Sequence, residues 1–87
     1  MPGATRAYRD RAGNIILDGI TTVRVNNMPI AFRGAPVLFH GRRRHAAPRM
    51  VQGSSTVRAG GRSVCRQGDV ASCGHRATGS ATVYIGG

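Results

Sequence analysis

The side chains best suited to chemistry in this sequence are cysteine and histidine. Cys73 and His75 are one residue apart in a Ser-Cys-Gly-His stretch, and His40 and His45 lie earlier, on either side of a run of three arginines. Thiolate sulfur and imidazole nitrogen are ligands that tetrahedral zinc accepts, and a Cys-x-His pair can reach one ion from a tight turn. The sequence therefore makes these four residues candidate metal ligands. The alternative is that the histidines are solvated loop residues beside a small buried cysteine.

Catalytic chemistry has little support. The only carboxylates are Asp10, Asp18 and Asp69, and there is no glutamate. Asp18 and Asp69 lie in turn contexts, where aspartate commonly accepts a hydrogen bond from its own backbone. Cys73 and His75 could form a thiolate–imidazole pair, but no third group is suggested to orient it. Because 87 residues are also few for a deep substrate pocket, we expect that the protein is not an enzyme.

The elements that must position these residues repeat along the chain. Residues 19–27, 53–61 and 79–87 share Gly, Thr and Val at their first, fourth and fifth places, and each closes on Asn-Asn or Gly-Gly. Similar residues follow the first two copies, whereas the third closes at Gly87. Self-similarity of this kind indicates a repeat architecture. The first interval is longer than the second, which predicts an inserted loop at about residues 38–48.

Each copy has the alternation of a strand. Val23-Arg-Val25, Val57-Arg-Ala59 and Val83-Tyr-Ile85 alternate apolar residues with polar or aromatic ones, the two-residue period of a half-buried strand. Asn-Asn and Gly-Gly pairs follow where a two-residue hairpin turn requires positive φ. Thirteen glycines argue against helices. We therefore predict an all-β fold of three hairpin units in a single domain over residues 1–87, with units at about 13–37, 49–71 and 76–87.

The stretch Gly53–Gly74, followed by Gly79–Gly86, resembles the PAAR-repeat proteins. Their pattern is a Gly-Ser-Pro-x-Val-x-Val-Asn-Gly strand and turn, then Pro-Ala-Ala-Arg, x-Gly-Asp and Ser-Cys-Gly. The tetrad is degenerate here: it reads Pro29-Ile-Ala-Phe32 in the first copy and Ser63-Val-Cys-Arg66 in the second. The Gly-Asp and Ser-Cys-Gly elements are both present. The similarity extends over about the whole chain and is most specific from Gly53 onward.

The resemblance implies a small cone of three pseudo-threefold β-hairpin repeats with a metal near its apex. It also implies a partner, because the cone's base would cap the blunt end of a trimeric β-helical spike, with one copy per trimer. That spike is VgrG in type VI secretion and the central baseplate spike in contractile phage tails. The cone would be the piercing tip that meets the target envelope, and secreted effectors would be further partners.

The resemblance also bears on the ligand set. His40 aligns with a family ligand, and Cys73 and His75 belong to the matching Ser-Cys-Gly element. The family's earliest histidine lies in an Asp-His-Gly-Gly stretch, where this chain has Asp10-Arg-Ala-Gly13. His45, Cys65 or a water is left as the fourth ligand. We expect one structural zinc, with iron as the alternative ion. A single Cys65–Cys73 bridge remains a second way to staple so weak a core.

The charge of the chain suggests an alternative function. All 13 basic residues are arginine, and the net charge is +10. Guanidinium groups match phosphate geometry, so a small arginine-rich nucleic-acid-binding β-domain is the alternative. No aromatic residue is interleaved in Arg42-Arg43-Arg44, and no helix is available for a major groove. Transient contact with an anionic envelope is therefore favoured over nucleic acid.

Targeting signals are not visible in the sequence. No apolar run follows the N-terminal Met-Pro-Gly-Ala-Thr-Arg, as it would in a signal peptide. No segment approaches the ~20 apolar residues of a membrane helix. We therefore expect cytoplasmic synthesis, followed by assembly at the tip of an injection machine or a virion tail.

Overall fold

The computed structural model describes residues 2–43 and 46–85. Four strands are defined: β1 (Ile20–Val25), β2 (Met28–Ile30), β3 (Arg58–Ala59) and β4 (Arg62–Ser63). β1 pairs with β2 and β3 pairs with β4, both antiparallel, and nine isolated bridges connect other parts of the described chain. The prediction of an all-β fold is confirmed. Within the described residues, no helix has the length and hydropathy that a membrane crossing requires.

Both hairpins turn where the sequence predicts. Asn26 and Asn27 between β1 and β2 have φ of 52° and 69°, and Gly60 and Gly61 between β3 and β4 have φ of 56° and 77°. Two successive left-handed residues match the right-handed twist of the flanking strands, which makes this the favoured two-residue turn. The Asn-Asn and Gly-Gly pairs are therefore required by the turns themselves.

A serine shapes the first residues of each of the last two repeat copies. Ser54 Oγ accepts hydrogen bonds from the N–H groups of Thr56 and Val57 at 3.2 and 2.9 Å. Ser80 Oγ does the same for Thr82 and Val83, at 3.1 and 3.0 Å. Both serines are buried, so their hydroxyls satisfy backbone donors that would otherwise be costly to bury.

Three segments far apart in sequence meet at the centre in a closed ring of backbone hydrogen bonds. Ala31 donates to the carbonyl of Thr5 at 2.9 Å, Thr5 donates to Cys65 at 3.1 Å, and Cys65 donates back to Ala31 at 2.9 Å. All three residues have no exposed surface. The N-terminal segment therefore has the same place at the centre as the segments that contain Ala31 and Cys65.

The same N-terminal segment pairs with the third repeat copy. Gly3 forms an antiparallel bridge with Tyr84. Ala4 donates to the carbonyl of Val83 and Ile85 donates to that of Pro2, both at 2.8 Å. The third copy thus finds a return segment at the opposite end of the chain, a pairing that the sequence analysis did not anticipate.

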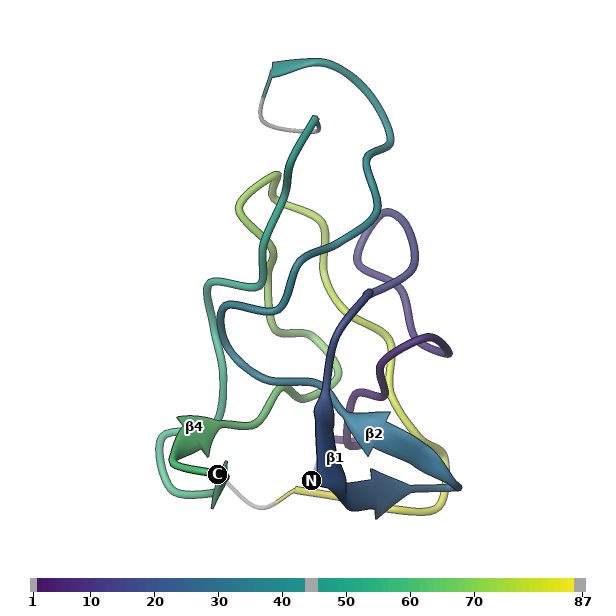
Figure 1. The fold of residues 1–87 in the computed structure, drawn as a ribbon, viewed down its shortest axis with the longest axis vertical. Coiled ribbons are helices and arrows are strands. Elements are labelled where there is room, and N and C mark those ends of the chain that lie inside the picture. The colour runs from purple at the N-terminus through teal and green to yellow at the C-terminus, as the bar shows by residue number, and fades with distance from the viewer. Residues whose placement is uncertain (1, 44–45, 86–87) are drawn as a thin grey trace.

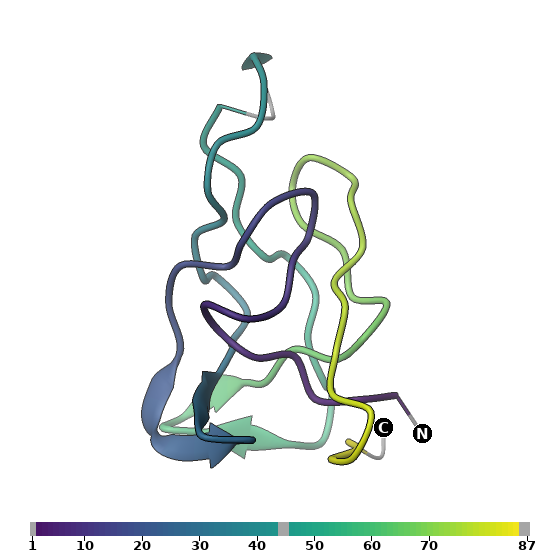
Figure 2. The same ribbon diagram turned by 90° about the vertical axis from the view of Figure 1, so that its right-hand side faces the viewer.

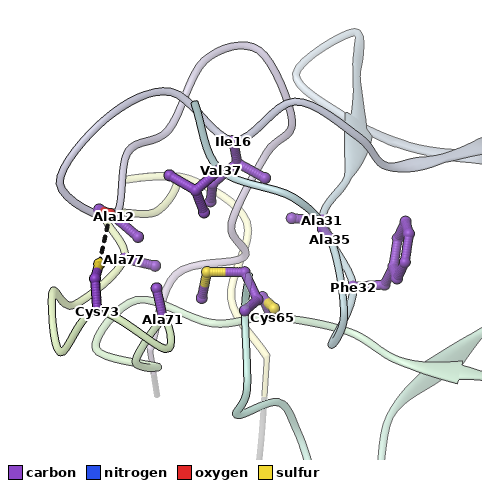
Figure 3. Close-up of a cluster of buried hydrophobic side chains, with 11 residues drawn as sticks. Ala12, Ile16, Ala31, Phe32, Ala35, Val37, Cys65, Ala71, Cys73 and Ala77 are labelled. Carbon is purple, nitrogen blue, oxygen red and sulfur yellow. Dashed lines mark hydrogen bonds between the residues drawn. The ribbon is translucent and has the colours of Figure 1, made fainter. Parts of the chain in front are cut away.

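Two clusters of mostly small side chains form the core. The first runs from Phe32 at one end to Ala12 and Cys73 at the other (Figure 3). The second lies around the hairpins and consists of Ala4, Val25, Ile30, Ala59, Val64 and Ile85. Because alanine and cysteine bury little apolar area, this core is thin, as the composition predicts.

The molecule is longer than it is wide, with extents of 32 × 24 × 22 Å. Both hairpins and residues 79–85 lie at one end of the long axis, called here the base (Figure 1). The segment 38–48, called the apical loop, extends beyond the rest of the chain at the opposite end; its residues 44–45 are outside the described part (Figures 1 and 2). The described residues of the predicted insertion thus lie in the projecting segment, while the insertion itself stays a prediction.

Candidate metal centre

His40, near the start of the apical loop, comes together with Cys73 and His75. Their possible ligand atoms all lie within 4.8 Å of one another. The two imidazole rings meet edge to face, with centroids 5.0 Å apart and planes at 64°. Cys73 is buried, His40 is half-buried and His75 is exposed. Two segments separated in sequence thus supply one thiol and two imidazoles to one small volume.

A glycine turn presents Cys73 and His75 to the same side. Gly74 between them has φ of 92°, and its N–H donates to the carbonyl of Ala71 at 2.9 Å. Ala71 in turn donates to the carbonyl of His75 at 2.9 Å. A side chain at position 74 would strain this left-handed conformation. The Cys-Gly-His spacing is therefore a property of the turn as well as of the ligands.

His40 is oriented by its own loop. Its Nδ1 lies 3.1 Å from the carbonyl oxygen of Leu38. A carbonyl can only accept, so this bond requires the proton on Nδ1 and places the ring's lone pair on Nε2. The loop is attached beside it, because Leu38 donates to the carbonyl of Ile15 at 2.9 Å and Asn14 Nδ2 donates to that of Phe39 at 3.2 Å.

Gly13 brings a third segment against the two imidazoles. Its φ is 88°, and a Cβ placed there would lie 2.5 Å from Cδ2 of His75 and 2.6 Å from Nε2 of His40. The neighbouring carbonyl of Ala12 lies 4.0 Å from Cys73 Sγ (Figure 3). Only glycine leaves the rings where they are. In the sequence, Asp10-Arg-Ala-Gly13 indicates only a missing ligand, and no residue type there marks this contact.

The donor set fits a structural metal ion. One thiolate and two imidazoles are typical zinc ligands, and with Zn–S near 2.3 Å and Zn–N near 2.0 Å their tetrahedral ligand atoms lie roughly 3.3–3.6 Å apart. The observed spread of up to 4.8 Å is therefore about 1 Å wider than closure around one ion requires. His40, Cys73 and His75 together could hold a metal ion.

Two further candidate ligands, His45 and Cys65, remain to be placed. His45 lies outside the described residues. Cys65 is fully buried and donates from Sγ to the carbonyl of Gln52 at 3.4 Å. Burial raises the pKa of the Cys65 thiol to about 12, with a further contribution from Asp69 that Arg66 opposes. Cys65 therefore keeps its proton. Neither cysteine is bridged, so a Cys65–Cys73 disulfide does not form in this structure.

Two arginine–aspartate pairs with the same geometry lie away from the metal group. Arg6 donates to Asp10 from its backbone N–H at 2.7 Å, from Nε at 2.8 Å and from Nη2 at 3.1 Å. Arg66 donates to Asp69 from the same three groups, at 2.7, 3.2 and 2.9 Å. Both aspartates are buried. The sequence placed Asp69 only in a turn and indicated neither arginine–aspartate pair, although Arg66-Gln-Gly-Asp69 lies next to the recognised Gly-Asp element.

The environment of Asp10 determines its ionisation. Burial opposes the charged form, but hydrogen bonds from the Arg6 side chain, the Arg6 backbone and the Thr78 hydroxyl outweigh it and lower the pKa of Asp10. The same pairing raises the pKa of Arg6, through its hydrogen bond to Asp10. The ionised carboxylate of Asp10 therefore stabilises the folded chain through these hydrogen bonds.

A comparison with family models matches residues 7–78 to the model described as the PAAR motif. The matched span contains both hairpins and the three residues of the metal group. Among curated proteins, no significant match was found.

Proposed function

Because this chain belongs to the family of PAAR-motif proteins, we propose that it is the tip of a contractile injection machine. In this proposal a single copy caps the trimeric β-helical spike, which is VgrG in a type VI secretion system or the central spike of a phage tail. The capped spike is sharpened for penetration of the target envelope. The family's role is structural, and we assign the chain no catalytic residue.

The central ring of hydrogen bonds is the observation that carries this proposal. A single chain can match a trimer only if it presents three similar faces, because the partner has three equivalent ones. Thr5, Ala31 and Cys65 exchange hydrogen bonds in a closed ring of three, and a repeat copy is bonded to each ring segment. That arrangement supports a base suited to a threefold partner.

The surface of the base has the character of a docking face. Val23 and Val83, which occupy the same place in their copies, are 39% and 37% exposed. Among the strand pairings of the described residues, β1 is bonded only to β2 and β3 only to β4. Open edges of this kind can be continued by strands of another protein and are a liability if left uncovered. Apolar contact and edge pairing together would bind the spike.

Within this function, we infer that His40, Cys73 and His75 bind one structural ion and that the ion is zinc. A bound ion would supply a cross-link between the apical loop and the Cys73 turn. Its binding energy would add to folding stability, which suits the thin core. His45 is proposed as the fourth ligand, with iron as the alternative metal.

Metal content tests the ion directly. Elemental mass spectrometry of the purified, untagged protein should find one zinc per chain. Cys73→Ser should lose it, whereas Cys65→Ser, which alters the thiol outside the group, should retain it. His45→Ala should weaken retention against a chelator. A folded wild-type protein without metal would contradict the assignment.

Copurification tests the spike. Coexpressed with a β-helical spike trimer, the chain should elute with it at one copy per trimer. The complex should survive a salt increase to about 0.2 M, which weakens phosphate contacts steeply. Sequence-preferring DNA binding that persists at that salt, with no spike association, would replace this proposal with the nucleic-acid alternative.

A further inference from the structure

The negative charges of this protein are largely internal. Asp10 and Asp69 are 3% and 2% exposed, and each is paired with an arginine close by in sequence. Asp18 is exposed, and its Oδ1 accepts from the N–H of Gly19 at 2.9 Å. With a net charge of +10, the surface is therefore strongly positive. A partner that binds outside the base therefore meets a positively charged surface, which favours a neutral or anionic partner.

The apical loop combines this charge with an exposed aromatic ring. Phe39 is 67% exposed, more than any other large apolar side chain in the described part of the chain. Arg42 and Arg43 are exposed three and four residues further on, and residues 38–48 contain no acidic residue. This loop lies at the end opposite the base (Figures 1 and 2).

The exposure of Phe39 is not the result of an unattached backbone. Its carbonyl accepts from Asn14 Nδ2 at 3.2 Å, and the preceding Leu38 donates to Ile15 at 2.9 Å. The following residue, His40, bonds back to Leu38 through Nδ1 at 3.1 Å. The main chain is thus held on both sides while the ring faces solvent. Because its backbone is already held, this segment loses less conformational entropy on contact with a partner.

We propose that Phe39, Arg42 and Arg43 are a contact site for the surface of an anionic phospholipid bilayer. The guanidinium groups would bind lipid phosphates, and the ring would enter the boundary between headgroups and acyl chains. The assignment rests on the proposed function, which places the base on the spike and the apical loop toward the envelope.

Bilayer contact suits this geometry better than nucleic acid does. Binding a strand of nucleic acid takes a groove along the backbone and several stacking platforms. Among the described residues of the apical loop, Phe39 is the exposed ring, and because the loop projects it can meet a broad surface end-on. Duplex DNA therefore serves as the competing ligand in the test.

The test uses flotation of the full chain, purified with its metal, with large unilamellar vesicles. Vesicles of equimolar phosphatidylglycerol and phosphatidylcholine should bind the protein at ~0.15 M salt, and vesicles of phosphatidylcholine alone should not. Arg42→Ser/Arg43→Ser should weaken binding by on the order of 25-fold, at roughly fivefold per arginine near the surface. Phe39→Ser should weaken it by about tenfold.

The matched control removes the same charge from the base. Arg24→Ser/Arg58→Ser changes two exposed arginines of β1 and β3, so both double variants have equal net charge. It should bind vesicles nearly as well as wild type. Equal losses in the two double variants would show attraction by net charge alone and would overturn the proposal.

A fluorescent reporter separates insertion from surface attraction. The chain has no tryptophan, so Phe39→Trp creates a single probe at the site and Val23→Trp a single probe at the base. Anionic vesicles should shift the emission of the first to shorter wavelength and leave the second unchanged. No shift at position 39, or displacement of vesicles by duplex DNA through Arg42 and Arg43, would overturn the assignment.

The two proposals fail in different ways. Spike copurification of the apical variants should equal that of wild type, because none of the changed residues lies at the base. Loss of vesicle binding in a wild-type protein that still caps the spike would reject the bilayer site alone. Absence of spike association would reject the proposed function whatever the vesicles show.

Discussion

At the scale of single residues, the candidate metal centre depends as much on glycines as on ligands. Gly74 permits the turn that presents Cys73 and His75, and Gly13 permits the close approach of a third segment to the imidazoles. Neither glycine donates an electron pair to an ion. The two glycines determine where the ligand atoms lie. In a closed metal site, that placement determines how tightly the ion is bound.

Gly13→Ala should reduce metal retention. The added Cβ would meet both imidazoles at 2.5–2.6 Å, and φ of 88° would strain any side chain at this position. We expect faster metal loss to a chelator and, from the strain alone, a loss of unfolding free energy of about 1 kcal/mol. Competition with a chromophoric chelator measures the first, and denaturant unfolding of the metal-free protein measures the second.

Gly68→Ala is the matched control for that variant. Its φ is 94°, but no atom lies within 4 Å of the added Cβ. It should show the same strain without any change in metal retention. If both variants lose metal equally, the proximity of Gly13 to the imidazoles is not what matters.

Asp10 should make the fold acid-sensitive. Its hydrogen bonds hold its folded-state pKa below the ordinary value of 3.8, so its stabilising contribution is present above that pH and is lost as the pH falls through the lower, folded value. Asp10→Asn should lower the unfolding free energy by on the order of 2 kcal/mol at neutral pH. The difference between the two proteins should narrow below about pH 4.

The measurement is chemical unfolding of both proteins in chelator, from about pH 6 down to about pH 2, which spans the change. Chelator removes the contribution of metal ligands, and the comparison with Asp10→Asn cancels the other carboxylates. A difference that stays constant over this range would show that ionised Asp10 does not stabilise the fold.

At the scale of elements, local patterns were predictable and long-range pairings were not. The turns at Asn26-Asn27 and Gly60-Gly61 require positive φ, and asparagine and glycine are the residue types that favour this conformation. The ring formed by Thr5, Ala31 and Cys65 consists of backbone bonds, which leave no mark on residue type. The Cys73–His75 pair was visible through its spacing, and its meeting with His40 was anticipated through the family resemblance.

The same limit explains the arginine–aspartate pairs. Arg66 and Asp69 lie in the second hairpin unit, where only the Gly-Asp element was recognised, and Arg6 and Asp10 precede the first unit. Phe32 of the first hairpin unit aligns with Arg66 of the second. Its ring centroid lies 4.9 Å from the guanidinium carbon of Arg62. A cation–π contact there replaces an ion pair, a substitution that no local pattern predicts.

The pairing of the two chain ends should be sensitive to Gly3. A Cβ at this position would overlap the backbone carbonyl of Ser80, which is main chain and cannot turn aside as a flexible side chain would. Gly3→Ala should therefore cost on the order of 3 kcal/mol, measured by denaturant unfolding. Gly34→Ala, with open space and φ of 101°, should cost about 1 kcal/mol.

Equal costs in these two variants would mean that the contact between the chain ends contributes little. Amide hydrogen exchange measures the same pairing independently. The amides of Ala4 and Ile85, which donate across this pairing, should lose protection in Gly3→Ala and keep it in Gly34→Ala.

At the scale of the whole molecule, the two ends of the long axis differ in kind. Among the described residues, the base carries two separate two-stranded sheets and exposed valines, and the opposite end carries the arginine-rich apical loop, whose His40 belongs to the metal group. The thin core between them is made mostly of alanine and other small residues. A structural ion at one end and a protein partner at the other would each stabilise what that core supports only weakly.

The opposed ends predict opposite responses to the same change. Val23→Asp places a carboxylate on the base, where burial against the spike would leave it without compensation. Phe39→Asp makes the equivalent change at the other end, on the more exposed side chain. The first should abolish coelution with the spike trimer, and the second should leave it unchanged. Coelution lost with Phe39→Asp and kept with Val23→Asp would mean that the spike binds the apical end, and the orientation proposed for the molecule would be reversed.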